Sequence, residues 1–322
     1  MARAVTGCFA RSLRFALAPL VVACASDGIL GIDESSSFSP GTALHTITVG
    51  SLQRSYIVHV PSHRPMTQSG TLLAYPLTIV LHGSSGSGDD IRGTTNMDSV
   101  SEANRVVVVY PNGVAGAGGL FPTDWNAGTC CGEAGREGID DLGFMRAMIA
   151  ELSAKLPIDK RRIHVAGFSD GGRMAYYMAC QMADQIAAIG VVSGSLRDDS
   201  CTPSRAVAVI ALHGTADPIV PYDESIDSPM PDPVDASMDA LPPSVQFWVV
   251  QDGCAVASDS SFTPSVIRTT FAKCSGSDVA FYSIDGGVHT WPVLVDPSSS
   301  DPDQTVSATA LITDFFKRHR LN

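Results

Sequence analysis

The sequence has few basic residues and lacks the common metal-binding and phosphate-binding motifs. Lysine and arginine total 21 against 33 aspartates and glutamates, which gives a formal net charge of -12. Nucleic acids and anionic membrane surfaces are negatively charged, so this balance argues against either as a partner. Neither Cys-x-x-Cys nor His-Glu-x-x-His occurs, and no glycine-rich loop ends in Gly-Lys-Ser/Thr. We therefore predict no metal, no cofactor and no phosphate-cradling loop.

The apolar run near the N-terminus, Phe15 to Ala23, is too short to span a bilayer. Three arginines precede it, which is typical of an export signal, so residues 1–23 are predicted to be a signal peptide that is removed. The run leads into Cys24 and resembles a bacterial lipobox there. We expect lipidation of Cys24, with residues 24–45 as a polar tether; ordinary secretion is the alternative. Either route gives an extracellular or cell-envelope protein, attached to a membrane only through the lipid.

Six cysteines remain after the one in the leader and the one at the cleavage point are set aside. An even number of cysteines in an exported chain predicts disulfides. The expected pairs are Cys180 with Cys201 and Cys254 with Cys274, which leaves Cys130 and Cys131 as a vicinal pair or as partners of the others.

The chain of 322 residues, 44% of them apolar, is long enough for one catalytic domain, predicted over residues 46–322. Short apolar strands alternate with helical patterns, which predicts an α/β fold with a mainly parallel central sheet flanked by helices. The clearest helices are expected over 141–156, 173–183 and 306–318. The expected strands are 47–49, 56–60, 77–81, 106–110, 163–166, 187–192, 207–212 and 279–284.

Two irregular stretches, 113–138 and 222–243, interrupt this alternation where loops should leave the C-terminal ends of strands. In open α/β sheets that edge holds the ligand crevice, so both are candidate walls of a substrate cleft. Merely irregular surface insertions are the alternative.

The segment from Gly167 to Gly171 has the pattern Gly-x-Ser-x-Gly, with Ser169 at its centre. The motif alone is weak evidence, but a β-branched run precedes it and a helical pattern follows it. That setting is typical of a nucleophile elbow, in which glycines without a Cβ let a tight turn expose the serine hydroxyl. Ser169 is therefore the predicted nucleophile.

A serine hydroxyl needs a base, and His289 is the best candidate because it lies in the loop between the last predicted strand and the terminal helix. An acid should lie between nucleophile and base at the end of a strand. Asp217 closes such a run, and Asp223 and Glu224 in the same loop are the alternatives. The backbone N–H groups of Ser84, in a glycine-rich loop, and Asp170, after the nucleophile, are the expected oxyanion hole.

The assembled motifs resemble those of an exported esterase family that includes poly(3-hydroxybutyrate) depolymerase-like proteins, feruloyl esterases and acetylxylan esterases. The resemblance spans Thr46 to His319 and implies the α/β-hydrolase fold, with a triad on Ser169, Asp217 and His289. Beyond the elbow it rests on Leu81-His82-Gly83, Tyr110-Pro111-Asn112-Gly113, Trp125-Asn126, Cys130-Cys131-Gly132, Asp140-Asp141-Leu142-Gly143-Phe144, His213-Gly214-Thr215-Ala216-Asp217 and His289-Thr290-Trp291-Pro292.

One departure from this family is Asp170, where members often carry a neutral residue; we expect its carboxylate to raise the pKa of His289. The expected activity is hydrolysis of carboxylic esters through an acyl-enzyme, on feruloyl or acetyl esters of plant cell-wall polysaccharide. Trp125, Phe121 and Trp291 are the expected apolar surface of the cleft, although buried aromatics explain them equally well. The alternatives are a polyester or oligomer depolymerase with the same triad, and a non-catalytic binding protein on a hydrolase scaffold.

Overall fold

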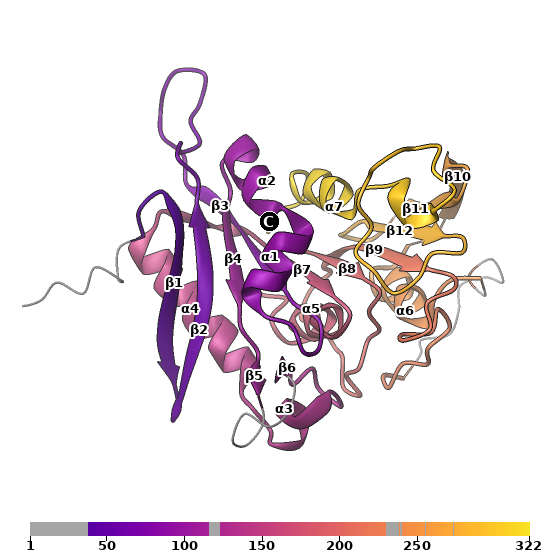
Figure 1. The fold of residues 1–322 in the computed structure, drawn as a ribbon, viewed down its shortest axis with the longest axis horizontal. Helices are drawn as coiled ribbons and strands as arrows, with labels where there is room; N and C mark the ends of the chain where they lie inside the picture. Colours follow the sequence, from indigo (N-terminus) through magenta and orange to yellow (C-terminus); the bar gives the residue numbers. More distant parts are fainter. Residues whose placement is uncertain (1–37, 116–122, 230–237, 239, 255, 273) are drawn as a thin grey trace, which may run out of the picture. The chain divides into compact units, whose positions relative to one another are not determined.

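The computed structural model describes residues 38–115, 123–229, 238, 240–254, 256–272 and 274–322 (Figure 1). The expected signal peptide, Cys24 and Phe121 lie outside the described residues. The expected tether ends too late, because residues 41–45 already belong to strand β1 (Gly41–Val49). This strand pairs residue by residue with β2 (Leu52–Val60). Most of β1 is exposed, so it lacks the apolar pattern that would have marked it in the sequence.

A 10-stranded sheet runs through the described part in the order β1-β2-β4-β3-β7-β8-β9-β12-β11-β10. A small second sheet pairs β5 with β6. Apart from β1 and β2, the strands are β3 (Tyr75–Leu81), β4 (Val107–Pro111), β5 (Val114–Ala115), β6 (Thr123–Asp124), β7 (Ile158–Phe168), β8 (Ala188–Val192), β9 (Ala208–Gly214), β10 (Val256–Thr263), β11 (Val266–Ala272) and β12 (Val279–Ile284).

The centre of the large sheet, from β4 through β12 in the order above, is parallel throughout. Antiparallel pairs close it at both ends. The predicted mainly parallel sheet is therefore confirmed, and each of the eight predicted strands corresponds to one of its strands. The β10–β11 hairpin was not predicted, because β10 is largely polar and exposed and because the buried residues of β11, Val266, Thr269 and Phe271, do not alternate strictly.

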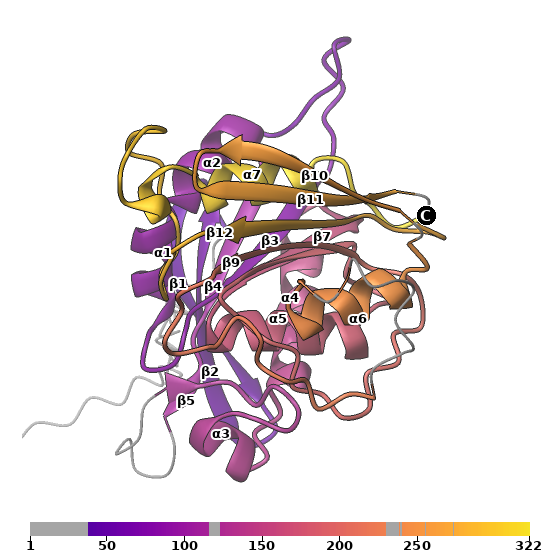
Figure 2. The same cartoon turned by 90° about the vertical axis from the view of Figure 1, so that its right-hand side faces the viewer.

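Helices cover both faces of this sheet (Figures 1 and 2). One buried cluster contains Phe144, Met174 and Val245, and so packs α4, α5 and α6 on one face. A second cluster contains Ile91, Met97 and Ile312, and packs α1, α2 and α7 on the other. The helices are α1 (Gly88–Thr95), α2 (Met97–Asn104), α3 (Gly132–Arg136), α4 (Asp141–Lys155), α5 (Asp170–Gln181), α6 (Pro243–Gln251) and α7 (Ala308–Phe316).

Three disulfides stabilise the described residues. The expected pairs Cys180–Cys201 and Cys254–Cys274 are confirmed, and Cys130 pairs with its neighbour Cys131, one of the two alternatives. None of the helices in the described ranges has both the length and the apolar character needed to span a membrane.

Candidate active site

Ser169 lies at a sharp turn between β7 and α5. Its φ of 56° and ψ of -118° lie outside the conformations that most side chains favour. A Cβ on Gly167 would lie 2.0 Å from the carbonyl oxygen of Gly171, and a Cβ on Gly171 would lie 2.4 Å from that of Leu81. Only glycine fits at either position. The elbow pattern in the sequence therefore has a steric cause in the packing of β3, β7 and α5.

Ser169, His289 and Asp217 form a continuous hydrogen-bonded chain. Nε2 of His289 lies 2.9 Å from Oγ of Ser169, and its Nδ1 lies 2.8 Å from Oδ2 of Asp217. The three residues follow β7, β12 and β9, whose carboxyl ends meet at one edge because these strands are parallel. This is the geometry that lets imidazole take a proton from a serine hydroxyl while a carboxylate holds the other ring nitrogen.

The Asp217 carboxylate has several hydrogen-bond donors around it. Oδ1 accepts from the backbone N–H groups of Ile219 and Val220, both at 2.9 Å. Burial by itself would raise the pKa of Asp217. Hydrogen bonds from His213, His289 and these backbone groups outweigh burial and hold the pKa well below its ordinary value. An ionised Asp217 is thus available to stabilise a positively charged His289 at neutral pH.

The backbone N–H groups expected to form an oxyanion hole are those of Ser84 and Asp170. Both residues line the cleft, and among the described residues neither N–H has a hydrogen-bond acceptor. The Ser84 loop is held from behind by His82, whose Nδ1 donates to the carbonyl of Gly83 at 2.7 Å while its Nε2 accepts from the N–H of Gly113 at 2.9 Å. These N–H groups are candidate donors to an anionic oxygen.

The Asp170 side chain contacts the backbone of Trp125, although its carboxylate was expected to act on His289. Its Oδ2 accepts from the backbone N–H of Trp125 at 3.0 Å, and its Oδ1 has no hydrogen-bond partner among the described residues. Burial, with a smaller contribution from the nearby carboxylate of Asp124, raises the pKa of Asp170 itself to about 7. The carboxyl group is therefore largely protonated below neutral pH, which removes much of the negative charge expected to act on His289.

A cleft of about 470 Å³ opens beside Ser169. The first irregular stretch, 113–138, lines the cleft as predicted. The prediction for 222–243 was wrong, because Ile219 and Val220, earlier in the loop after β9, line the cleft instead. The lining residues are Ser84, Asp124, Cys131, Gly132, Glu133, Arg136, Ser169, Asp170, Arg173, Ile219 and Val220.

Two of the aromatic residues expected to line this cleft, Trp125 and Trp291, are buried elsewhere. Trp125 is 0% exposed and donates its indole N–H to the carbonyl of His82 at 2.9 Å, beneath the cleft floor. Trp291 is 3% exposed and donates to Oγ1 of Thr309 in the second core cluster. The expectation was wrong for both because each indole finds an apolar enclosure and a hydrogen-bond acceptor inside the fold.

Sequence reasoning missed Arg173, Ile219 and Val220 as cleft residues. Arg173 follows Ser169 by one helical turn, a spacing that places two side chains on one helix face and would have been the available signal. Glu224, considered as an alternative acid, forms an ion pair with Arg173 at 3.1 Å.

Two groups of side chains in the described residues are close enough to share an ion, Cys130 with Cys131 and Asp170, and Cys180 with Asp198 and Cys201. In both groups the sulfur atoms are joined in a disulfide. Because thiolate sulfur is the metal ligand, neither group offers the donors of a zinc site.

Comparison with known proteins places this geometry among esterases. A family model described as Phospholipase/Carboxylesterase matches residues 135–229, which include Ser169 and Asp217. The putative esterase NocK of Nocardia uniformis is 26% identical over 78% of this chain and 74% of its own. Feruloyl esterase C of Emericella nidulans is 26% identical over 83% of this chain and 89% of its own.

Solved structures show the same fold. An acetyl xylan esterase from Aspergillus awamori superposes with a TM-score of 0.53 at 15% identity, covering 78% of this chain and 95% of its own. The large mixed sheet, flanked by helices and with the elbow after β7, is that of the α/β-hydrolases. The chain is therefore an esterase with the α/β-hydrolase fold, similar to feruloyl esterases and acetylxylan esterases.

Proposed function

We propose that this protein is an exported serine esterase that cleaves carboxylic esters through an acyl-enzyme. The observation that carries the proposal is the hydrogen-bonded chain from Ser169 through His289 to Asp217 at the edge of an open cleft. Ser169 is the nucleophile, His289 the general base and acid, and Asp217 the residue that orients His289.

In the first half of the reaction, Nε2 of His289 takes the hydroxyl proton as Oγ of Ser169 bonds to the ester carbonyl carbon. The N–H groups of Ser84 and Asp170 stabilise the resulting oxyanion. His289 then gives the proton to the alkoxy oxygen, the carbon–oxygen bond breaks, and the alcohol leaves. A water molecule repeats the sequence on acyl-Ser169 and releases the carboxylic acid.

The proposed substrates are feruloyl or acetyl esters of plant cell-wall polysaccharide. Support comes from relatives whose names state those substrates, among them feruloyl esterase C and a bifunctional acetylxylan esterase/xylanase from Neocallimastix patriciarum. The cleft lies within the about 300–1,000 Å³ typical of small-molecule sites.

Export is part of the same proposal. Three disulfides are typical of a protein that folds in an oxidising compartment. The leader predicts signal cleavage before Cys24 and acylation of that residue. Labelling of producing cells with a palmitate analogue tests the anchor: wild type should incorporate the label and Cys24→Ala should not, whereas an unlabelled, released wild type means ordinary secretion.

The test of function compares purified wild type with Ser169→Ala on methyl ferulate, acetylated xylan, p-nitrophenyl acetate and soluble hydroxybutyrate oligomers. Ser69→Ala, at an exposed position remote in sequence, is the matched control. Loss of the nucleophile should lower kcat by at least about 10⁴-fold, while the control keeps full activity. A preference for the oligomers would favour the polyester role. A folded protein inactive on every ester would instead favour a binding protein.

A further inference from the structure

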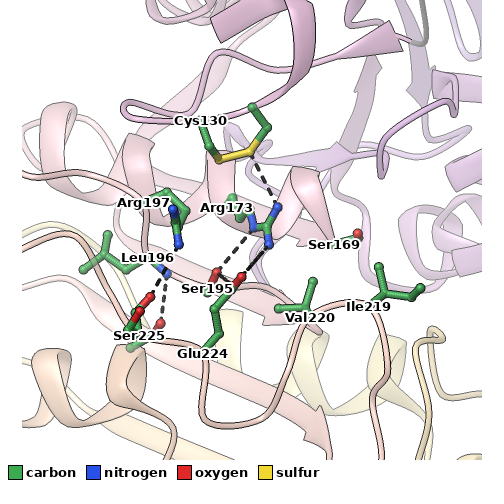
Figure 3. A network of polar contacts seen from close by, with 12 residues as sticks. Cys130, Ser169, Arg173, Ser195, Leu196, Arg197, Ile219, Val220, Glu224 and Ser225 are labelled. Atoms are coloured by element: carbon green, nitrogen blue, oxygen red, sulfur yellow. Dashed lines mark hydrogen bonds and ion pairs between the residues drawn. A yellow bond between two sulfur atoms is a disulfide. The ribbon is translucent and has the colours of Figure 1, made fainter.

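Arg173 lies on α5 one turn after Ser169 and lines the cleft. Figure 3 shows its guanidinium between Glu224 and the disulfide of Cys130. The backbone N–H of Arg173 donates to the carbonyl of Ser169 at 3.0 Å, so the two residues share the first turn of the helix. Its Nη2 bonds both carboxylate oxygens of Glu224, at 3.1 and 3.2 Å, and its Nε donates to Oγ of Ser195 at 3.3 Å. Ser195 in turn donates to Glu224. The side chain is thereby held in one orientation.

One nitrogen of this guanidinium lacks a strong acceptor. Nη1 lies 3.7 Å from Sγ of Cys131, and this sulfur is its acceptor among the described residues. Sulfur is a weak acceptor, and this one is already committed to the disulfide with Cys130. Because Cys131 and Arg173 both line the cleft, the remaining donor capacity of Nη1 is available to a ligand there.

The segment that follows Ser195 contacts three neighbouring parts of the chain. Arg197 forms an ion pair with Asp227 at 3.0 Å, and its carbonyl accepts from the N–H of Thr129 at 2.8 Å. The N–H of Leu196 donates to Oγ of Ser244 at 2.9 Å. The Arg173 side chain itself is held by Glu224 and Ser195, so its guanidinium loses little conformational entropy when a ligand binds.

The chemistry of the triad indicates which part of an ester the cleft holds. The leaving alkoxy oxygen must accept a proton from Nε2 of His289, so the alcohol lies on the His289 side. His289 is not among the lining residues, whereas the candidate oxyanion donors Ser84 and Asp170 are. The acyl group therefore extends into the cleft, between the apolar wall of Ile219 and Val220 and the polar wall of Arg173.

We propose that Arg173 is a specificity-determining residue whose Nη1 donates a hydrogen bond to an oxygen substituent on a large acyl group, such as an oxygenated aromatic acid. This inference rests on the proposed esterase function. An acetyl group would fill only a small part of the 470 Å³ and would leave this donor unused.

Methyl ferulate and methyl cinnamate test the proposal because they share the methyl alcohol and the acyl skeleton but only ferulate carries ring oxygens. Wild type should prefer ferulate in kcat/KM by about 10- to 100-fold, as expected for a hydrogen bond from a charged donor. Arg173→Met, which keeps length but has no donor, should bring the ratio close to one by raising KM for ferulate, with KM for cinnamate and kcat nearly unchanged.

Arg197→Met is the matched control, since Arg197 is ion-paired in the same network but does not line the cleft; it should keep the wild-type ratio. If Arg173→Met does not fold, the double variant Arg173→Met with Glu224→Gln replaces it, because this variant also removes the Glu224 carboxylate that would be left without its partner. The double variant must show the same loss of preference for methyl ferulate. An unchanged ratio in either folded variant, or a wild type without preference, overturns the inference. Cleavage of p-nitrophenyl acetate with both methyl esters inert overturns it while leaving the esterase intact, whereas silence on all esters sinks the proposed function itself.

Discussion

Val220 donates its backbone N–H to Oδ1 of Asp217 at 2.9 Å, and Val220 also lines the cleft beside Ser169. The proposed triad acid therefore holds both the imidazole of His289 and the wall against which an acyl group would pack. The position of His289, the proposed base, and the shape of the cleft at Val220 therefore depend on the same carboxylate, that of Asp217.

Asp217→Asn should lower kcat by about 10³- to 10⁴-fold, because the amide cannot hold the required tautomer of His289 or stabilise its charged form. Steady-state kinetics on p-nitrophenyl acetate measure this effect. Asp223→Asn in the same loop is the control and should leave kcat within about 2-fold of wild type. Equal losses in the two variants would point to general disruption of the loop and contradict the assigned role.

Gly171→Ala should destabilise the fold by more than about 2 kcal/mol, because the new Cβ would lie 2.4 Å from the carbonyl oxygen of Leu81. Gly93→Ala, in α1, is the matched control. Its Cβ would meet nothing within 4 Å, and alanine favours a helix by up to about 1 kcal/mol. In urea unfolding, Gly171→Ala should have a lower free energy of unfolding than wild type and Gly93→Ala a higher one. Equal stability of the two variants would show that the backbone around Ser169 shifts to accommodate the new Cβ.

Asp141→Ala should lower the free energy of unfolding by about 3–5 kcal/mol. Nη2 of Arg54 lies 2.7 Å from Oδ1 of Asp141, and both side chains are almost completely buried. The guanidinium also stacks on Phe144, with Cζ 4.1 Å from the ring centroid. Truncation leaves a buried cation without its partner. The double variant Arg54→Met with Asp141→Leu should recover part of the loss. A double variant less stable than Asp141→Ala in urea unfolding would mean that the ion pair itself stabilises the fold.

Asp252→Asn should remove a pH dependence of stability. Burial raises the pKa of Asp252 to about 7, and nearby Asp278 acts in the same direction. Between about pH 4 and 7 the native state holds a proton that the unfolded chain has released, so stability falls as pH rises through this window. Between pH 4 and pH 8, the free energy of unfolding of the wild type should therefore fall by on the order of 3 kcal/mol relative to that of the variant.

Thermal unfolding at several pH values measures this difference. Asp199→Asn is the control, because it removes an exposed carboxylate and changes the net charge by the same amount. Its stability should depend on pH as that of the wild type does. Parallel pH profiles for wild type and Asp252→Asn would contradict the raised pKa.

Several features of the fold followed from local sequence signals. The apolar strands and the helix after Ser169 were predictable because each buries a periodic face in the core. Strand β10 and helices α1 and α2 were not predicted, since their many exposed residues leave a weak periodic pattern. Strand β1 was missed in part for the same reason.

By itself, the sequence determined the alternation of strands and helices, the elbow around Ser169 and the placing of Asp217 and His289 after later strands. Those features depend on neighbouring residues, and parallel pairing then brings the strand ends to one edge. Only the tertiary structure decided that Trp125 and Trp291 are buried, that Asp170 contacts Trp125, and that Arg173 pairs with Glu224. The physical reason is that the direction and environment of a side chain are set by residues distant in the chain, whose contacts form only when the whole core packs.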